Sequence, residues 1–126
     1  MNQVQKNVLE FHRAFGLGES QVPVIPPKDV CELRIKLIQE ELNELKLALE
    51  AGDIIETADA LGDLDYVVKG TAIVCGLDMD PIDAEVHRSN MTKVGGYKRE
   101  DGKWIKPPTY SPPDLGPILD AMRKQV

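Results

Sequence analysis

Two short acidic clusters in this chain could bind a cation together. Their members are spaced to share helix faces: Glu40, Glu41 and Glu44 in the first cluster, and Glu56, Asp59 and Asp63 in the second. Side chains three or four residues apart lie on one face of a helix, and like charges at that spacing destabilise it by roughly 0.2–0.5 kcal/mol per pair. The repetition of this pattern therefore predicts a cation that holds the carboxylates together. Clusters made only of oxygen ligands suit Mg²⁺ or Mn²⁺.

The elements that carry these clusters are predicted to be helices. Apolar residues recur at helical spacing over about residues 2–15, 29–51, 54–75 and 80–93. Asp29, Asp53 and Asp80 are the expected N-caps of the last three helices, and Glu56 follows Asp53 at the distance of a capping box. This spacing gives Glu56 a structural alternative to metal binding, so Asp59 ranks above it as a ligand.

The predicted fold is an all-α bundle of four main helices in a single domain, residues 1–126. Its helical core covers about residues 2–93, and a proline-rich C-terminal arm covers about residues 94–126, with a short helix near residues 118–123 and no convincing strand. The helix over residues 29–51 is apolar on nearly all sides, which predicts burial on more than one side. In so small a chain this indicates a subunit interface, and we expect a homodimer or homotetramer.

Composition narrows the function classes. The net charge of −6 and the pI near 4.9 argue against a nucleic-acid partner, although a nucleotide substrate is compatible with them because bound metal inverts the local charge. No segment approaches the roughly 18 apolar residues of a membrane span, so we expect no membrane partner. The chain begins with an amphipathic segment rather than a signal peptide, and its two cysteines are too few for a disulfide framework. We expect a cytoplasmic protein.

Basic residues follow the fourth predicted helix. Asn90 and Lys93 lie at its end, and Lys98, Arg99 and Lys103 lie in the tail of an otherwise acidic chain. Lys93 could compensate the helix dipole, and the tail lysines could be solvated residues of a turn. Alternatively, these side chains could hold a polyphosphate.

The motifs together resemble a known family. Residues 40–44 have the pattern Glu-Glu-x-x-Glu, residues 62–67 read Gly-Asp-Leu-Asp-Tyr-Val, and residues 85–93 read Glu-Val-His-Arg-Ser-Asn-Met-Thr-Lys. This arrangement resembles the MazG-like nucleoside triphosphate pyrophosphohydrolases. They belong to the all-α NTP pyrophosphatases, with the dimeric dUTPases and phosphoribosyl-ATP pyrophosphohydrolase. The resemblance spans most of the chain, from about residue 10 to residue 114.

The resemblance implies roles for individual residues. Glu41 and Glu44 fall on the first metal-binding motif, and Glu40 falls on the glutamate that activates the attacking water, so Glu40 and Glu41 are the expected catalytic residues. Asn90 and Lys93 fall on the residues that contact phosphates. The family uses two or three Mg²⁺ ions per site and often assembles as dimers or tetramers, in which one subunit can supply part of another's site.

The second metal-binding motif of the family, Glu-x-x-Asp, has two possible registers here. If Asp63 is its aspartate, the glutamate position is occupied by Ala60, and Asp59 is the nearest substitute. In the other register, Glu56 and Asp59 form the motif themselves. Both registers retain Asp59.

Three functional hypotheses follow. The first is Mg²⁺-dependent hydrolysis of a nucleoside or deoxynucleoside triphosphate to the monophosphate and pyrophosphate, which would remove unwanted nucleotides. The second is a pyrophosphohydrolase acting on phosphoribosyl-ATP. The third is a non-catalytic helical interaction module, which should show no stabilisation by Mg²⁺.

Overall fold

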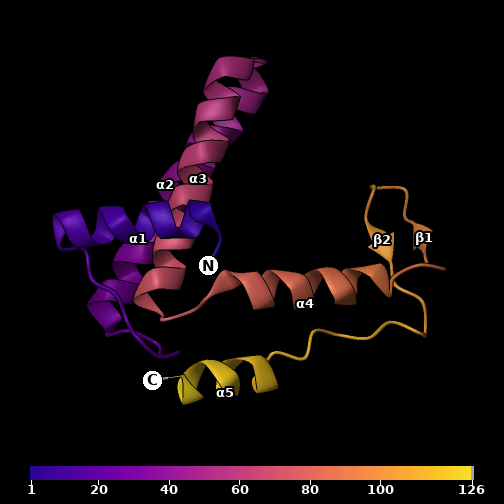
Figure 1. Cartoon of the computed structure of the whole chain (residues 1–126). Coiled ribbons are helices and arrows are strands. Elements are labelled where there is room, and N and C mark those ends of the chain that lie inside the picture. The colour runs from indigo at the N-terminus through magenta and orange to yellow at the C-terminus, as the bar shows by residue number, and fades with distance from the viewer. Residues whose placement is uncertain (126) are drawn as a thin grey trace.

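The chain is mostly helical, as predicted (Figure 1). The computed structural model describes residues 1–125 and contains, in order, α1 (Gln3–Phe15), α2 (Lys28–Ala51), α3 (Ile54–Val74), α4 (Met79–Met91), β1 (Tyr97–Lys98), β2 (Trp104–Ile105) and α5 (Gly116–Lys124). The expectation of an arm without strands was wrong, because β1 and β2 form a small antiparallel hairpin. Over residues 1–125, no helix combines the length and apolarity needed to cross a membrane.

The helix starts agree only in part with the predicted caps. Asp53 caps α3 as expected, since its Oδ1 accepts a hydrogen bond from the Glu56 backbone N–H at 3.1 Å. The other two predicted caps were wrong. The N-cap of α2 is Pro27, which places Asp29 inside the first turn, and α4 is capped by Asp78, whose side chain accepts from the Asp80 N–H.

The main packed unit consists of α1, α2 and α3. The helices α2 and α3 pack against each other, and α1 packs against α3. Ala48 and Ala60 are buried, with exposed fractions of 7% and 3%, and such small side chains let helix backbones approach closely. This packing sets the distance between the two helices that carry the acidic clusters.

A buried arginine joins α2 to α3, close to His12 of α1. The Arg34 guanidinium donates from Nε to Thr71 Oγ1 at 3.1 Å and from Nη2 to the Val67 carbonyl at 2.7 Å. A side chain at Gly70 would place its Cβ 2.4 Å from Arg34 Nη2 and 2.8 Å from His12 Nε2. Only glycine therefore fits here without displacing the arginine. Burial lowers the pKa of Arg34.

The helix α4 leads away from this unit instead of packing along it as a fourth bundle member (Figure 1). Its first turn is held by Gln5, which is fully buried and whose amide donates to the Leu77 carbonyl at 2.7 Å and accepts from the Met79 N–H at 3.0 Å. The arm then runs back beside α4, where Ser89 Oγ donates to the Ser111 carbonyl at 2.8 Å.

Candidate functional site

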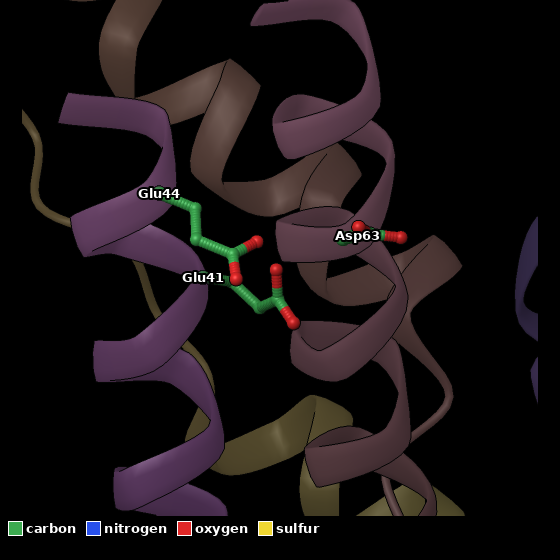
Figure 2. Close-up of side chains that lie close together, drawn as sticks. All are labelled: Glu41, Glu44 and Asp63. Carbon is green, nitrogen blue, oxygen red and sulfur yellow. The ribbon is translucent and has the colours of Figure 1, made fainter. Parts of the chain in front are cut away.

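Three carboxylates from two helices converge, as the helical spacing predicted. Glu41 and Glu44 reach from α2 toward α3, which carries Asp63 (Figure 2). One oxygen from each carboxylate lies within 4.8 Å of the other two. The structure therefore brings together three of the residues that the sequence assigned to one site, and their role as metal ligands stays a prediction.

Glu41 is half-buried, like Asp63, but one of its carboxylate oxygens is fully enclosed. Its Oε2 is shielded from solvent and has no hydrogen-bond partner among residues 1–125. Burial raises the pKa of Glu41, and the neighbouring charges of Glu44 and Asp63 raise it further. An unpartnered carboxylate oxygen of this kind is costly in the absence of a positive group.

The donor set fits a divalent cation. Oxygens bound to one Mg²⁺ at about 2.1 Å lie no more than about 4.2 Å apart, so a modest change of side-chain torsion would bring the present 4.8 Å within range. Carboxylates without nitrogen or sulfur ligands are typical of Mg²⁺ and Mn²⁺ sites. A cation would also supply the missing partner of Glu41 Oε2. Glu40 is exposed and close enough to contribute to the raised pKa of Glu41.

Glu56 and Asp59 lie in a hollow that extends this acidic surface. The hollow has a volume of about 370 Å³ and is lined by Glu44, Glu56, Asp59 and Ala60 among others. Glu56 and Asp59 therefore open onto the same space as Glu44, whereas Asp63 does not line this hollow. The capping-box alternative for Glu56 loses its basis, because the Asp53 N–H donates to the Ala48 carbonyl at 3.1 Å.

The basic candidates lie at the far end of α4 and beyond it. Asn90 is exposed and Lys93 is half-buried, with the Lys93 Nζ 5.9 Å from the centroid of the Tyr110 ring. Arg99 is already engaged, since its Nε donates to Asp101 Oδ1 at 2.9 Å. Lys98 and Lys103 are exposed and form no ion pair within the part of the chain that the structure describes.

Within one chain, the acidic cluster and these basic residues are far apart. Asp63 lies about 16 Å along α3 from Val74, and α4 adds about 20 Å in another direction, at 1.5 Å per residue. An extended nucleoside triphosphate is shorter than the resulting separation. The carboxylates and the Lys93 region of the same chain therefore cannot hold the same nucleotide in this conformation.

Sequence reasoning missed the aromatic residues of the arm. Trp104 Nε1 donates to the Lys93 carbonyl at 2.8 Å, and Lys106 Nζ lies 4.6 Å from the Tyr110 ring centroid. The signal was present as aromatic residues interleaved with lysines over residues 97–110. It was interpreted as a basic tail because nothing local indicates the hairpin that folds it back onto α4.

Comparisons with known proteins bear on the family of the chain. A family model described as phosphoribosyl-ATP pyrophosphohydrolase matches residues 8–90, which include all the candidate metal-binding carboxylates and end at Asn90. An uncharacterized protein of Acanthamoeba polyphaga mimivirus is 37% identical over 76 residues, which make up 56% of this chain and 30% of the viral protein. The chain thus matches less than a third of that relative's length. Because the family model covers more than half of the chain, the chain belongs to the phosphoribosyl-ATP pyrophosphohydrolase family, part of the MazG-like all-α NTP pyrophosphatase superfamily.

Proposed function

We propose that this protein is a Mg²⁺-dependent nucleotide pyrophosphohydrolase that converts a nucleoside or deoxynucleoside triphosphate to the monophosphate and pyrophosphate. The observation that carries the proposal is the convergence of Glu41, Glu44 and Asp63, in which the enclosed Glu41 Oε2 has no hydrogen-bond partner among the described residues. Membership in the family supports a nucleotide pyrophosphohydrolase activity in general.

The chain's own residues have distinct tasks in this proposal. Glu41, Glu44 and Asp63 would hold Mg²⁺, with Asp59 and Glu56 available to further ions from the adjoining hollow. When bound, the metal supplies charge neutralisation for the polyphosphate and lowers the pKa of a bound water. Glu40, which is exposed and precedes Glu41 in the chain, would accept the proton of the attacking water. Pyrophosphate is the leaving group.

The site would be shared between copies of the chain. Lys93 and the hairpin residues Lys98 and Lys103 are too far from their own carboxylates to reach the same substrate, but a second copy could supply them. The helices α2, α3 and α4 expose large apolar side chains, and monomeric proteins seldom leave large apolar patches uncovered. Seven of these side chains, with exposed fractions of 38–77%, are Leu42, Leu47, Ile54, Ile55, Leu61, Val86 and Met91. A homodimer or homotetramer would bury these faces and bring one copy's lysines to another's carboxylates.

A substrate screen tests the activity. Nucleoside triphosphates, deoxynucleoside triphosphates and phosphoribosyl-ATP are incubated with the protein and Mg²⁺, and pyrophosphate release is measured. We expect release that EDTA abolishes and that Glu41→Gln reduces by at least 100-fold, in line with the loss of an essential charged group at a catalytic centre (about 2.7 kcal/mol or more). Absence of pyrophosphate release from every substrate would refute the proposal and favour the interaction module.

Phosphoribosyl-ATP is the second candidate substrate, because the matching family model carries that name. Its cleavage would use the same carboxylates and release the same leaving group, pyrophosphate. The ratio of kcat/KM for phosphoribosyl-ATP and for ATP distinguishes the two candidates. A ratio well above one would assign the protein to the narrower activity.

A further inference from the structure

A shallow hollow at the end of α4 combines an aromatic side chain, an amide and an ammonium group. It has a volume of about 240 Å³ and is lined by Asn90, Lys93, Val94 and Trp104. Its lining residues come from the end of α4, the turn after it and β2. The hairpin β1–β2 lies at the end of α4, which leads away from the packed helices (Figure 1).

Trp104 is held in place by its polar edge. Its Nε1 donates to the Lys93 carbonyl at 2.8 Å, which fixes the indole against the end of α4. Gly96 makes this approach possible, because a Cβ there would lie 2.7 Å from Trp104 Nε1 and 2.0 Å from the Ile105 carbonyl oxygen. Yet 46% of the Trp104 surface remains exposed. A ring whose orientation is already fixed loses little conformational entropy when a ligand stacks on it.

The surroundings of the ring favour a nucleobase over a bare phosphate. The hollow adjoins the C-terminus of α4, where the helix dipole disfavours anions, so a polyphosphate gains least there. The exposed Asn90 amide offers both a donor and an acceptor, which matches the edge of a base. Lys93 lines the hollow, and Lys98 is the cross-strand partner of Trp104, so two lysines lie near the hollow and could attract the phosphates of a nucleotide.

We propose that Trp104 is the platform on which the nucleobase of the substrate stacks, with Asn90 contacting the base edge and Lys93 directing the phosphates away from the hollow. This inference rests on the proposed function for the identity of the ligand. The base would be read by one copy of the chain while the carboxylates of another copy hold the phosphates. Base–aromatic stacking contributes about 1–3 kcal/mol per base, which is a factor of about 5 to 150 in affinity.

The test uses the intrinsic fluorescence of Trp104, which is the chain's single tryptophan. The full-length protein with Mg²⁺ is titrated with α,β-methylene nucleoside triphosphates carrying each of the four common bases, and with inorganic pyrophosphate and ribose 5-phosphate as base-free probes. N-acetyltryptophanamide corrects for absorption by the nucleotides. We expect saturable quenching by at least one nucleotide and none by the base-free probes. Quenching by pyrophosphate alone, or by no probe, would overturn the proposal.

Variants separate stacking from a structural role. Trp104→Leu should raise the dissociation constant and KM for the preferred nucleotide by about 5- to 150-fold with little change in kcat, whereas Trp104→Phe should stay within a few-fold of the wild type. Tyr97→Leu is the matched control, because Tyr97 is a 63% exposed aromatic of the same hairpin that does not line the hollow. An equal effect of Tyr97→Leu, or a change in sedimentation of Trp104→Leu, would show instead that the hairpin is a subunit contact.

Failure of the stacking proposal can be distinguished from failure of the proposed enzymatic activity. Nucleotide-dependent quenching without any pyrophosphate release would retain the platform and refute the enzymatic activity. Pyrophosphate release with an unchanged KM in Trp104→Leu would retain the activity and refute the platform.

Discussion

Neutralising Glu41 should affect stability in opposite directions with and without Mg²⁺. The substitution Glu41→Gln removes one charge from three carboxylates whose oxygens lie within 4.8 Å of one another. At that separation each pair of charges repels by about 0.9 kcal/mol at the dielectric constant of water and by about 3.5 kcal/mol at an effective value of 20. Glu44 is exposed and Asp63 is half-buried, so the lower figure applies. Relief of two repulsions then stabilises the metal-free protein by about 2 kcal/mol.

The glutamine amide introduced by this substitution should add to the stabilisation, because it can donate a hydrogen bond to the carboxylate of Glu44 or Asp63. For a chain of this length, about 2 kcal/mol corresponds to a rise in melting temperature of roughly 5–10 °C. The wild type should instead gain stability from Mg²⁺, by about 2.7 kcal/mol at a concentration 100 times Kd. The variant lacks the charge and should gain little. The order of the two melting temperatures should therefore reverse when Mg²⁺ is added.

The assay is thermal unfolding at pH 8 in EDTA and in excess Mg²⁺, at one fixed protein concentration because oligomers melt in a concentration-dependent way. The matched control is Glu50→Gln, on the same helix. Glu50 is 62% exposed and has only a 3.9 Å ion pair with Lys46, so its loss should change the free energy of unfolding by no more than about 0.5 kcal/mol. The reasoning is refuted if Glu41→Gln lowers the melting temperature in EDTA, or if the wild type does not respond to Mg²⁺.

Four further outcomes are expected. Burial and like charges raise the pKa of Glu41, so protons compete with the metal, and the Kd for Mg²⁺ measured by calorimetry should fall as pH rises. The metal-free protein should lose stability as pH rises from the ordinary to the raised pKa of Glu41. Asp59→Asn should lower kcat in the pyrophosphate-release assay much more than Glu56→Gln, and the reverse order would assign the second motif to the other ligand. Mixing inactive Glu41→Gln and Lys93→Ala chains under conditions of subunit exchange should restore up to about a quarter of the wild-type rate in a dimer, whereas no recovery would show that both groups serve the same copy. Gly70→Ala should destabilise the fold by about 1–3 kcal/mol in denaturant titration, since its Cβ would displace buried groups.

The features that could be predicted from sequence are those governed by short-range periodicity. The convergence of Glu41 and Glu44 follows from helical spacing alone, and Asp63 joins them because a short turn after Ala51 folds α3 back beside α2. The cap at Asp53 could also be predicted, because it depends only on residues adjacent in sequence. In contrast, the caps at Asp29 and Asp80 failed because capping depends on the backbone angles of a single residue, which neighbouring aspartates or prolines can take over.

Features that depend on contacts between residues distant in sequence could not be predicted. The direction of α4 depends on Gln5, more than 70 residues away from the two backbone groups that it bonds. The buried position of Arg34 depends on the missing side chain of Gly70 and on Thr71 of another helix. Within an apolar segment, a single arginine gives no sign that it will be enclosed. The hairpin was missed because each of its strands contains only two residues.

The buried amide of Gln5 fixes the N-terminal end of α4, so a small rotation there displaces the far end of the helix. The helix is about 20 Å long, so a rotation of about 10° at the Gln5 contacts would move its far end by about 3.5 Å. A displacement of about 1 Å in a substrate-positioning group can cost 100-fold in rate. The two hydrogen bonds of Gln5, together with those from Met1 and Asn2 to Asp78 and Asp80, therefore help to set the direction in which α4 leads toward Lys93 and Trp104. Gln5 is remote from both the carboxylates and the proposed base platform. Substitutions at Gln5 would therefore change the position of Lys93 and Trp104 without altering the chemistry of either side chain.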